Sequence, residues 1–234
     1  MSVPQGKISI GPPSLDKLLL GGVRRGEVAL VYGEAGTGKT TTVIQAATAA
    51  ANEGLKVIYI DSDHSFTQQR FNQIAGERSR ELSELINLFL PETFSEQRSI
   101  IESLENYVTP SLGVVIVDSV SSLYRAEFSK DATIFSLNRD LTRQLAYLGE
   151  LVATHSIACI LTSQVHARLK PPEADIEPVA KRTLFHFPQV ILRLRNTPKP
   201  GVKEVVLERI DGVDGEKRSC LVALRDAGLT ETEN

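Results

Sequence analysis

One stretch of the sequence has the residue types and the spacing of a phosphate-binding loop. Residues 33–40 read Gly-Glu-Ala-Gly-Thr-Gly-Lys-Thr, which is the pattern G-x-x-x-x-G-K-T. Its glycines let successive backbone N–H groups point at a phosphate, its lysine reaches the β- and γ-phosphates, and its threonine hydroxyl ligates Mg²⁺. The sequence therefore predicts a site for ATP and Mg²⁺. The residues expected to form it are Gly33, Glu34, Ala35, Gly36, Thr37, Gly38, Lys39, Thr40 and Thr41.

Polar residues at the ends of three other apolar stretches are candidates for the rest of this site. Asp118 ends the run of residues 114–117 and is expected to support Mg²⁺, with Thr40 as the other metal ligand. Hydrolysis also needs a group that orients the attacking water, and Asp63 is the candidate, with Asp61 competing for the role. Gln164 is placed to sense the γ-phosphate, so the expected catalytic residues are Asp63, Gln164 and Lys39. Each strand-end residue has a simpler alternative role as a cap of its strand.

The elements that must position these residues alternate between strands and helices. Apolar strands are expected at 28–32, 57–60, 112–117 and 157–162, and helices at 40–53, 67–85, 95–107 and 133–154. Alternating strands at 188–195 and 202–210 predict an antiparallel hairpin, and 219–224 is expected to close the sheet. Continuous apolar strands between helices are typical of a parallel sheet covered on both faces. The prediction is an α/β fold with an antiparallel C-terminal edge.

Composition sets the class of protein. The chain has 234 residues, is 41% hydrophobic and 24% charged, and contains no apolar run of the roughly 20 residues that a membrane helix needs. The N-terminus lacks the layout of a signal peptide, so a cytoplasmic location is expected. Cys159 lies in an apolar run and reads as a core residue, and Cys159 and Cys220 are expected to be reduced rather than joined.

The charge is uneven along the chain. The net charge is −3, yet residues 181–225 hold ten Lys/Arg against five Asp/Glu, while residues 76–105 hold seven Glu against three Arg. A basic face beside an acidic one is compatible with a polyanionic partner, and ordinary surface variation is the alternative.

The order of these motifs resembles the ATPase core of RecA/RadA-type recombinases. The resemblance begins with residues 10–27, continues through the phosphate-binding loop, and covers residues 8–228. The segments 59–70, 118–125, 162–165 and 183–186 are similar to those that carry the catalytic acid, the metal-supporting aspartate and the ends of the second DNA-binding loop. Within this family, the chain resembles the short archaeal paralogues called RadB. This resemblance implies a single RecA-like domain over residues 1–234, without the N-terminal helical DNA-binding domain and linker of full recombinases, and an accessory role.

The resemblance also assigns roles to individual residues. It implies that Arg70 lies on or near the adenine, as a planar cation would. Gln164 would couple the γ-phosphate to the second DNA-binding loop. The catalytic glutamate of the family falls on Asp63, and aspartate is one methylene shorter, so slow hydrolysis with intact ATP binding is expected.

The resemblance implies that the second DNA-binding loop of the family falls at residues 166–182 and that Arg125 and Lys130 belong to the first. The basic residues of the two loops, which could neutralise phosphates, are Arg125, Lys130, Arg168, Lys170, Lys181 and Arg182. The second loop also holds three acidic residues and no aromatic residue for base stacking. We expect weak, salt-sensitive and sequence-independent binding of single-stranded DNA.

Three functions are consistent with these observations. The first is an ATP-binding, DNA-dependent ATPase that assists a full-length RadA-type recombinase in DNA recombination and repair. The second is a regulatory protein of the circadian-clock-like branch of the same superfamily, acting through protein contacts. That branch carries adjacent acidic residues at the Asp63 position, whereas His64 follows Asp63 here, which favours the first function. The third is a nonhydrolysing, ATP-gated scaffold. A homo-oligomer is possible in each case.

Overall fold

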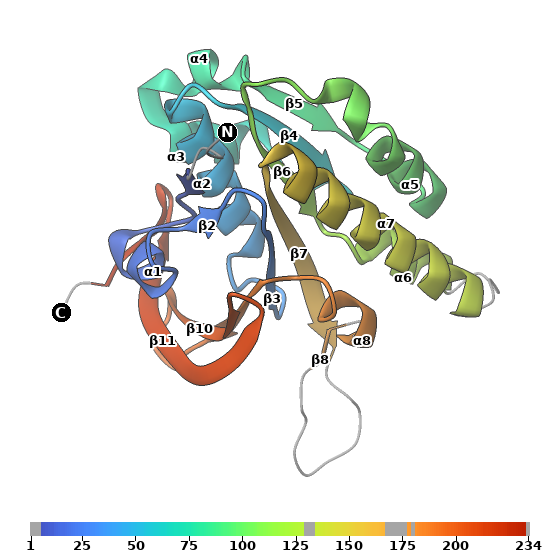
Figure 1. Ribbon diagram of the computed structural model, residues 1–234. Helices are drawn as coiled ribbons and strands as arrows, with labels where there is room; N and C mark the ends of the chain where they lie inside the picture. The colour runs from blue at the N-terminus through green and yellow to red at the C-terminus, as the bar shows by residue number, and fades with distance from the viewer. Residues whose placement is uncertain (1–5, 129–133, 167–176, 179–180, 233–234) are drawn as a thin grey trace, which may run out of the picture.

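The computed structural model describes residues 6–128, 134–166, 177–178 and 181–232. Within these ranges most strands join one twisted sheet in the order β12-β11-β10-β9-β3-β7-β6-β4-β5, with β8 paired to β7 (Figure 1). The strands of this sheet are β3 (Val28–Gly33), β4 (Lys56–Asp61), β5 (Ile86–Phe89), β6 (Leu112–Asp118), β7 (Ala158–His166), β8 (Glu177–Pro178), β9 (Val190–Asn196), β10 (Val202–Ile210), β11 (Val213–Arg225) and β12 (Gly228–Glu231).

Strands β5, β4, β6, β7, β3 and β9 run parallel, and β9 to β12 continue as an antiparallel meander. This arrangement confirms the predicted α/β fold with a mostly parallel sheet and an antiparallel edge. Because the carboxyl ends of parallel strands meet at one edge of a sheet, residues that follow β3, β4, β6 and β7 are brought together there.

Helices cover both faces of the parallel part (Figure 1). One face carries α2 (Lys39–Asn52), α3 (Gln68–Ala75) and α4 (Ser79–Ser83), and the other carries α5 (Phe94–Glu102), α6 (Ser122–Phe128) and α7 (Ile134–His155). Two short helices add to these cores: α1 (Pro13–Leu18) contributes Leu15 and Leu18 to the core on the α2 side, and α8 (Lys181–Leu184) contributes Leu184 to the core on the α7 side.

Alternate side chains of each central strand pack into the two hydrophobic cores, one on each face of the sheet. In β3, Ala29 and Val31 pack with α2, whereas Val28 and Leu30 pack with α7. A strand with both faces buried must be apolar throughout, which is why these strands read as continuous apolar runs. Cys159 of β7 is fully buried, as predicted, and both cysteines are free.

The helix-prone region 67–85 is helical but divided, because Gly76 adopts a φ of 63° and separates α3 from a 3-10 turn and α4. Two other expectations about elements were wrong. Residues 86–89, for which no strand was predicted, form β5 at one end of the sheet. Residues 219–224 do not close the sheet, since β12 pairs outside β11.

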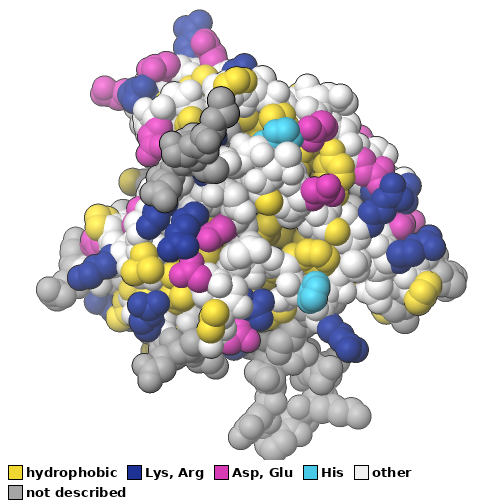
Figure 2. Space-filling model, in the orientation of Figure 1, with side chains coloured by type: hydrophobic (Ala, Val, Ile, Leu, Met, Phe, Trp, Pro, Cys, Tyr) yellow, Lys and Arg dark blue, Asp and Glu magenta, His cyan; other side chains and the backbone are white. Residues whose placement is uncertain are grey.

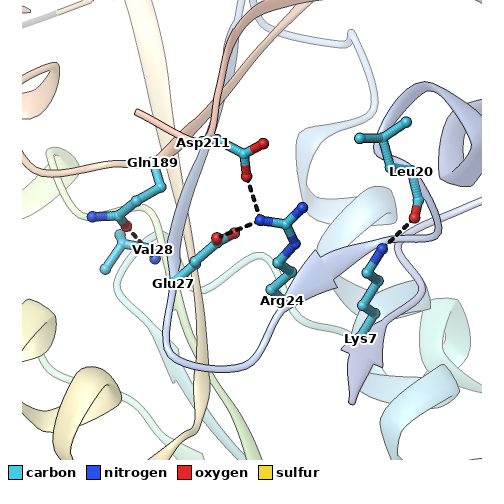
Figure 3. Close-up of polar contacts among 7 residues, drawn as sticks. All are labelled: Lys7, Leu20, Arg24, Glu27, Val28, Gln189 and Asp211. Carbon is cyan, nitrogen blue, oxygen red and sulfur yellow. Dashed lines mark hydrogen bonds and ion pairs between the residues drawn. The ribbon is translucent and has the colours of Figure 1, made fainter. Parts of the chain in front are cut away.

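A small two-stranded sheet near the N-terminus, whose strands are separated in sequence by α1, contacts the main sheet at the start of β3 (Figure 3). Strands β1 (Lys7–Ile8) and β2 (Val23–Arg24) pair antiparallel, and Lys7 donates to the carbonyl of Leu20. Arg24 reaches both Glu27, at 3.4 Å, and Asp211 in the turn after β10. These contacts fix the amino end of β3, the strand that leads into the phosphate-binding loop.

No helix in the described ranges is both long enough and apolar enough to span a membrane.

Candidate nucleotide site

The loop between β3 and α2 has the backbone that its glycines predict. Gly36 and Gly38 have φ values of 73° and 98°, a region that residues with a side chain rarely adopt. Helix α2 begins at Lys39, immediately after Gly38. The N–H groups in the first turn of a helix have no intrahelical acceptor, so they are available to an anion at this point. The loop and the helix together form a cradle for phosphate.

A cleft of about 450 Å³ opens beside this cradle. Its walls come from the loop, from α2, and from the carboxyl ends of β4, β6, β7 and β11. The lining residues are Ala35, Gly36, Gly38, Lys39, Thr40, Thr41, Asp63, Ser65, Asp118, Gln164 and Leu224. Four segments that are far apart in the sequence therefore place polar side chains around one space.

Lys39 is folded over the loop. Its side chain is buried, with 8% of the residue exposed, and Nζ donates to the carbonyl of Glu34 at 2.7 Å. Burial lowers the pKa of Lys39, and the charges of Asp118, Asp63 and Glu34 oppose that shift. The ammonium group thus lies among carboxylates at the point where a phosphate would supply negative charge.

Asp118 and Thr40 meet at the cleft floor. Asp118 is 1% exposed and accepts hydrogen bonds from Tyr59, at 2.9 Å, and from Thr162. Burial raises the pKa of Asp118, while hydrogen bonds from Thr162, Thr40 and Tyr59 lower it. The Thr40 hydroxyl lies 3.4 Å from Ser65 Oγ. A hydroxyl and a carboxylate side by side are oxygen ligands of the kind that Mg²⁺ takes.

The structure separates the roles of Asp61 and Asp63. Asp61 is fully buried and accepts the backbone N–H groups of Ser65, at 3.1 Å, and Phe66, at 2.8 Å, so it caps the turn after β4. Asp63 instead lines the cleft and is half-buried. Burial raises the pKa of Asp63, a hydrogen bond from Ser122 lowers it, and the charge of Arg125 also lowers it.

Gln164 lines the cleft at the end of β7, and its Oε1 accepts a hydrogen bond from Arg125 Nη1 at 3.1 Å. The sequence placed Arg125 in the first DNA-binding loop. It lies instead within α6, a helix that the sequence reasoning did not predict, and its guanidinium points back to the nucleotide side.

Arg70 lies next to the cleft, on the side of Leu224, but it is not one of the lining residues. Its guanidinium donates to the Thr41 hydroxyl at 3.1 Å and to the carbonyls of Arg225, at 3.0 Å, and Asp226, at 2.8 Å. These contacts tie α3 to α2 and to the turn between β11 and β12.

The predicted DNA contacts are only partly within the described residues. Lys130, Arg168 and Lys170 lie outside them, and of Lys181 only the backbone, in α8, is described. Arg182 is exposed on α8.

Among the described side chains of residues 181–225, some of the basic residues lie close to acids. Lys/Arg and Asp/Glu side chains are interspersed on the face seen in Figure 2. Arg209 lies 2.6 Å from Asp214, and Arg195 lies 4.0 Å from Glu204. Arg209 and Arg195 are thus already paired with acids.

The sequence reasoning missed several residues of the site. Ser65 hydrogen-bonds Asp118 at 3.4 Å and Asp61 at 3.4 Å, and Tyr59 and Thr162 hold Asp118 from the neighbouring strands. Register explains the strand contacts, because β4 and β7 flank β6. A sequence pattern could have suggested them only after the strand order was known.

Comparison with known proteins places this arrangement in a family. The model of the Rad51 family matches residues 6–229. A DNA repair and recombination protein RadB of Thermococcus kodakarensis is 38% identical over 205 residues, which is 86% of this chain and 89% of that protein. A protein of the same name from Pyrococcus furiosus is 34% identical over 230 residues, covering 97% of this chain and 96% of that one.

A solved structure is similar over almost the same extent. The crystal structure of the RadB recombinase superposes with a TM-score of 0.81 at 35% identity, covering 97% of this chain and 100% of that chain. These matches agree with the recombinase resemblance and give no support to the circadian-clock-like alternative. The chain belongs to the Rad51 family.

Proposed function

We propose that this chain is an ATP-binding recombinase paralogue that binds single-stranded DNA and assists homologous recombination and DNA repair, with ATP hydrolysed slowly. The observation that carries the proposal is the convergence of Lys39, Thr40, Asp63, Asp118 and Gln164 on one cleft from four separate segments. The relatives named RadB are DNA repair and recombination proteins, and members of the family are ATPases.

The residues of the cleft fit MgATP by their chemistry. The left-handed glycines and the start of α2 supply backbone donors for phosphate oxygens, and Lys39 supplies a cation. Thr40 and Asp118 would hold Mg²⁺, which when bound neutralises phosphate charge. Arg70, beside Leu224, would support the adenine at the other end of the cleft.

Asp63 and Gln164 would act on the side of the cleft opposite the loop. Asp63 would orient the attacking water and accept its proton, since it is the acid that lines the cleft while Asp61 is engaged with backbone amides. The short aspartate side chain favours binding of ATP over its turnover. Gln164 would respond to the γ-phosphate from the strand that leads into the second DNA-binding loop.

The partner is single-stranded DNA, bound without sequence preference, and the accessory role implies a full-length RadA-type recombinase. The proposed phosphate contacts are Arg182 and the basic residues of the two loops. A chain that contacts phosphates releases counterions on binding, so its affinity must fall as salt rises.

The test is a titration of labelled single-stranded DNA with the full chain, with and without MgATP. We expect weak binding that strengthens with MgATP, and a clear loss of affinity between about 50 and 200 mM salt. Two oligonucleotides of different sequence should bind equally. If the chain bound no DNA in any of these conditions, including low salt with MgATP, protein contacts would remain as the mode of action and this proposal would be overturned.

A further inference from the structure

One face of helix α6 contacts two segments that line the cleft, namely the residues that follow β4 and the carboxyl end of β7. At its first residue, the Ser122 hydroxyl lies 3.2 Å from the carbonyl oxygens of both Ser62 and Ser119, and a hydrogen bond from this hydroxyl lowers the pKa of Asp63. One turn later, Arg125 Nη1 donates to Gln164 Oε1 at 3.1 Å. Residues three apart in a helix share a face. The short helix therefore touches the segment after β4 and the end of β7 at the same time.

Charges on three elements act on the carboxylate of Asp63. Burial and the charge of Asp61 raise its pKa, whereas the charges of Arg125 on α6 and of Lys39 at the start of α2 lower it. Arg125 is also only partly exposed, and one of its nitrogens is already occupied by Gln164. This guanidinium is placed among groups of the nucleotide cleft rather than on a free basic surface.

Helix α6 is anchored to the layer behind it. The hydroxyl of Tyr124 donates to Asn138 Oδ1 of α7 at 2.9 Å, and the Tyr124 ring meets the Phe94 ring of α5 edge-on at 5.8 Å. Phe128 stacks on Tyr124 at 6.5 Å. A displacement of α6 relative to the cleft would therefore require α7 or these aromatic contacts to shift as well.

We propose that Arg125 is a positioning residue of the nucleotide site, where it holds the Gln164 amide and balances the Asp63 carboxylate, and thereby links α6 to the end of the cleft that takes the γ-phosphate. The inference rests on the proposed function, because it assumes that the cleft binds ATP. It departs from the expectation that Arg125 contacts DNA phosphate.

The chemistry of this position favours a triphosphate over a diphosphate. A terminal phosphate near Gln164 and Asp63 adds negative charge beside Asp63, and an arginine is the side chain that neutralises such a group with more than one N–H at once. A diphosphate held at the loop places no charge there. Arg125 should therefore contribute to the affinity for ATP and little to the affinity for ADP.

The experiment compares three variants of the full chain by calorimetric titration with MgATP and MgADP in the absence of DNA. Arg125→Gln removes the charge, Arg125→Lys keeps it without the planar fork, and Arg139→Gln removes the same charge from an exposed position on α7. For Arg125→Gln we expect ATP affinity to fall about ten-fold, the size of one charge-assisted hydrogen bond, and ADP affinity to change less than about two-fold. The ATP affinity of Arg125→Lys should lie between those of wild type and Arg125→Gln, and Arg139→Gln should bind both nucleotides as wild type does.

An unchanged ratio of ATP to ADP affinity in Arg125→Gln would overturn the inference, even if that variant lost affinity for single-stranded DNA, since such a loss alone identifies a DNA contact. If Arg125→Gln does not fold, Arg125→Lys decides, because it retains the charge and must still lower the ratio. Wild-type protein that bound neither nucleotide would be a different result, since it would remove the proposed function itself.

Discussion

Asp63 and Asp118 are both acids whose pKa is raised, and burial is the main cause for each. In both cases the ionised form is the one that the proposed chemistry needs, Asp118 to support Mg²⁺ and Asp63 to accept a proton. Lys39 lies in the field of both carboxylates. A cation that binds beside these carboxylates therefore stabilises their ionised forms, which burial disfavours.

The stability of the protein without nucleotide should report the ionisation of Asp118. Because the pKa of Asp118 in the folded chain lies above its ordinary value, ionisation of this group costs stability. Below about pH 4 the group is protonated in the folded and unfolded chain, and its contribution to the free energy of unfolding is fully present. That contribution is lost as the pH rises through the raised pKa of the folded chain. Asp118→Asn should therefore raise the melting temperature at pH 7.5 in the absence of Mg²⁺, where each kcal/mol is worth roughly 2–4 °C in a chain of this size.

The matched variant is Asp226→Asn, which alters an exposed aspartate in the turn after β11 and should leave the melting temperature nearly unchanged. In urea unfolding, the increase in the free energy of unfolding caused by Asp118→Asn should become smaller as the pH is lowered toward about 4. A gain that stayed constant across this pH range would show that ionisation is not its cause.

The length of the Asp63 side chain should limit turnover. Asp63→Glu restores the reach of the acid that the recombinase resemblance implies at this position. We expect turnover of ATP to rise about ten-fold, which is less than the 10²–10⁴ that a fully positioned base contributes, because only the reach of the acid changes. Asp63→Asn should reduce turnover to background while MgATP still binds. Steady-state phosphate release measures both, and no increase in Asp63→Glu would count against the role of Asp63.

At the residue scale, the sequence was informative where chemistry depends on a local pattern. The loop of residues 33–40 and the strand-end residues Asp118, Asp63 and Gln164 line one cleft, because parallel strands end at one edge. The choice between Asp61 and Asp63 could not be predicted, since it depends on which backbone amides meet Asp61. The position of Arg125 depends on a contact between α6 and β7 that no local pattern contains.

At the scale of elements, β3 and β9 approach so closely that the loop must start with glycine. A Cβ on Gly33 would lie 2.3 Å from the carbonyl oxygen of Leu194 and 3.0 Å from Thr37 Oγ1. Since the first of these atoms belongs to the backbone of a buried strand, it cannot move aside without shifting β9. Gly33→Ala should destabilise the fold by about 1–3 kcal/mol or more and weaken ATP binding, as measured by urea unfolding and nucleotide titration.

The contrasting change is Gly149→Ala in α7, where an added Cβ meets no atom within 4 Å. Alanine is a better helix former than glycine, so this variant should be more stable than wild type by about 0.5–1 kcal/mol. Equal effects of the two substitutions would contradict the close approach of β3 and β9.

Elements with strong periodicity were predictable, and short ones were not. Helix α7 is long and apolar on its buried side, and the central strands are apolar throughout because both of their faces are buried, so their patterns are clear. Strand β5 has only four residues, Ile86–Phe89, and follows a polar region that favours a helix. Its existence depends on pairing with β4, which is a tertiary contact.

At the scale of the whole molecule, the strand order brings the nucleotide cleft and the segments that flank the proposed DNA-binding loops to one edge of the sheet. Strand β7 carries Gln164 near its carboxyl end and leads toward the second loop, while β6 ends in Asp118 and leads through α6 toward the first. The segments that lead to both loops therefore begin at residues that line the cleft. Binding of ATP and of DNA should therefore influence each other in this chain.

The most direct test of the account is a calorimetric titration of MgATP into the wild-type chain and into Lys39→Ala. The account predicts saturable binding to wild type that requires Mg²⁺, and an affinity about 10–100-fold lower in Lys39→Ala, because one charge-assisted contact to phosphate is lost. Circular dichroism should show that the two proteins are folded alike. Equal affinity of the two proteins for MgATP, or no binding to wild type at millimolar ATP, would contradict the account.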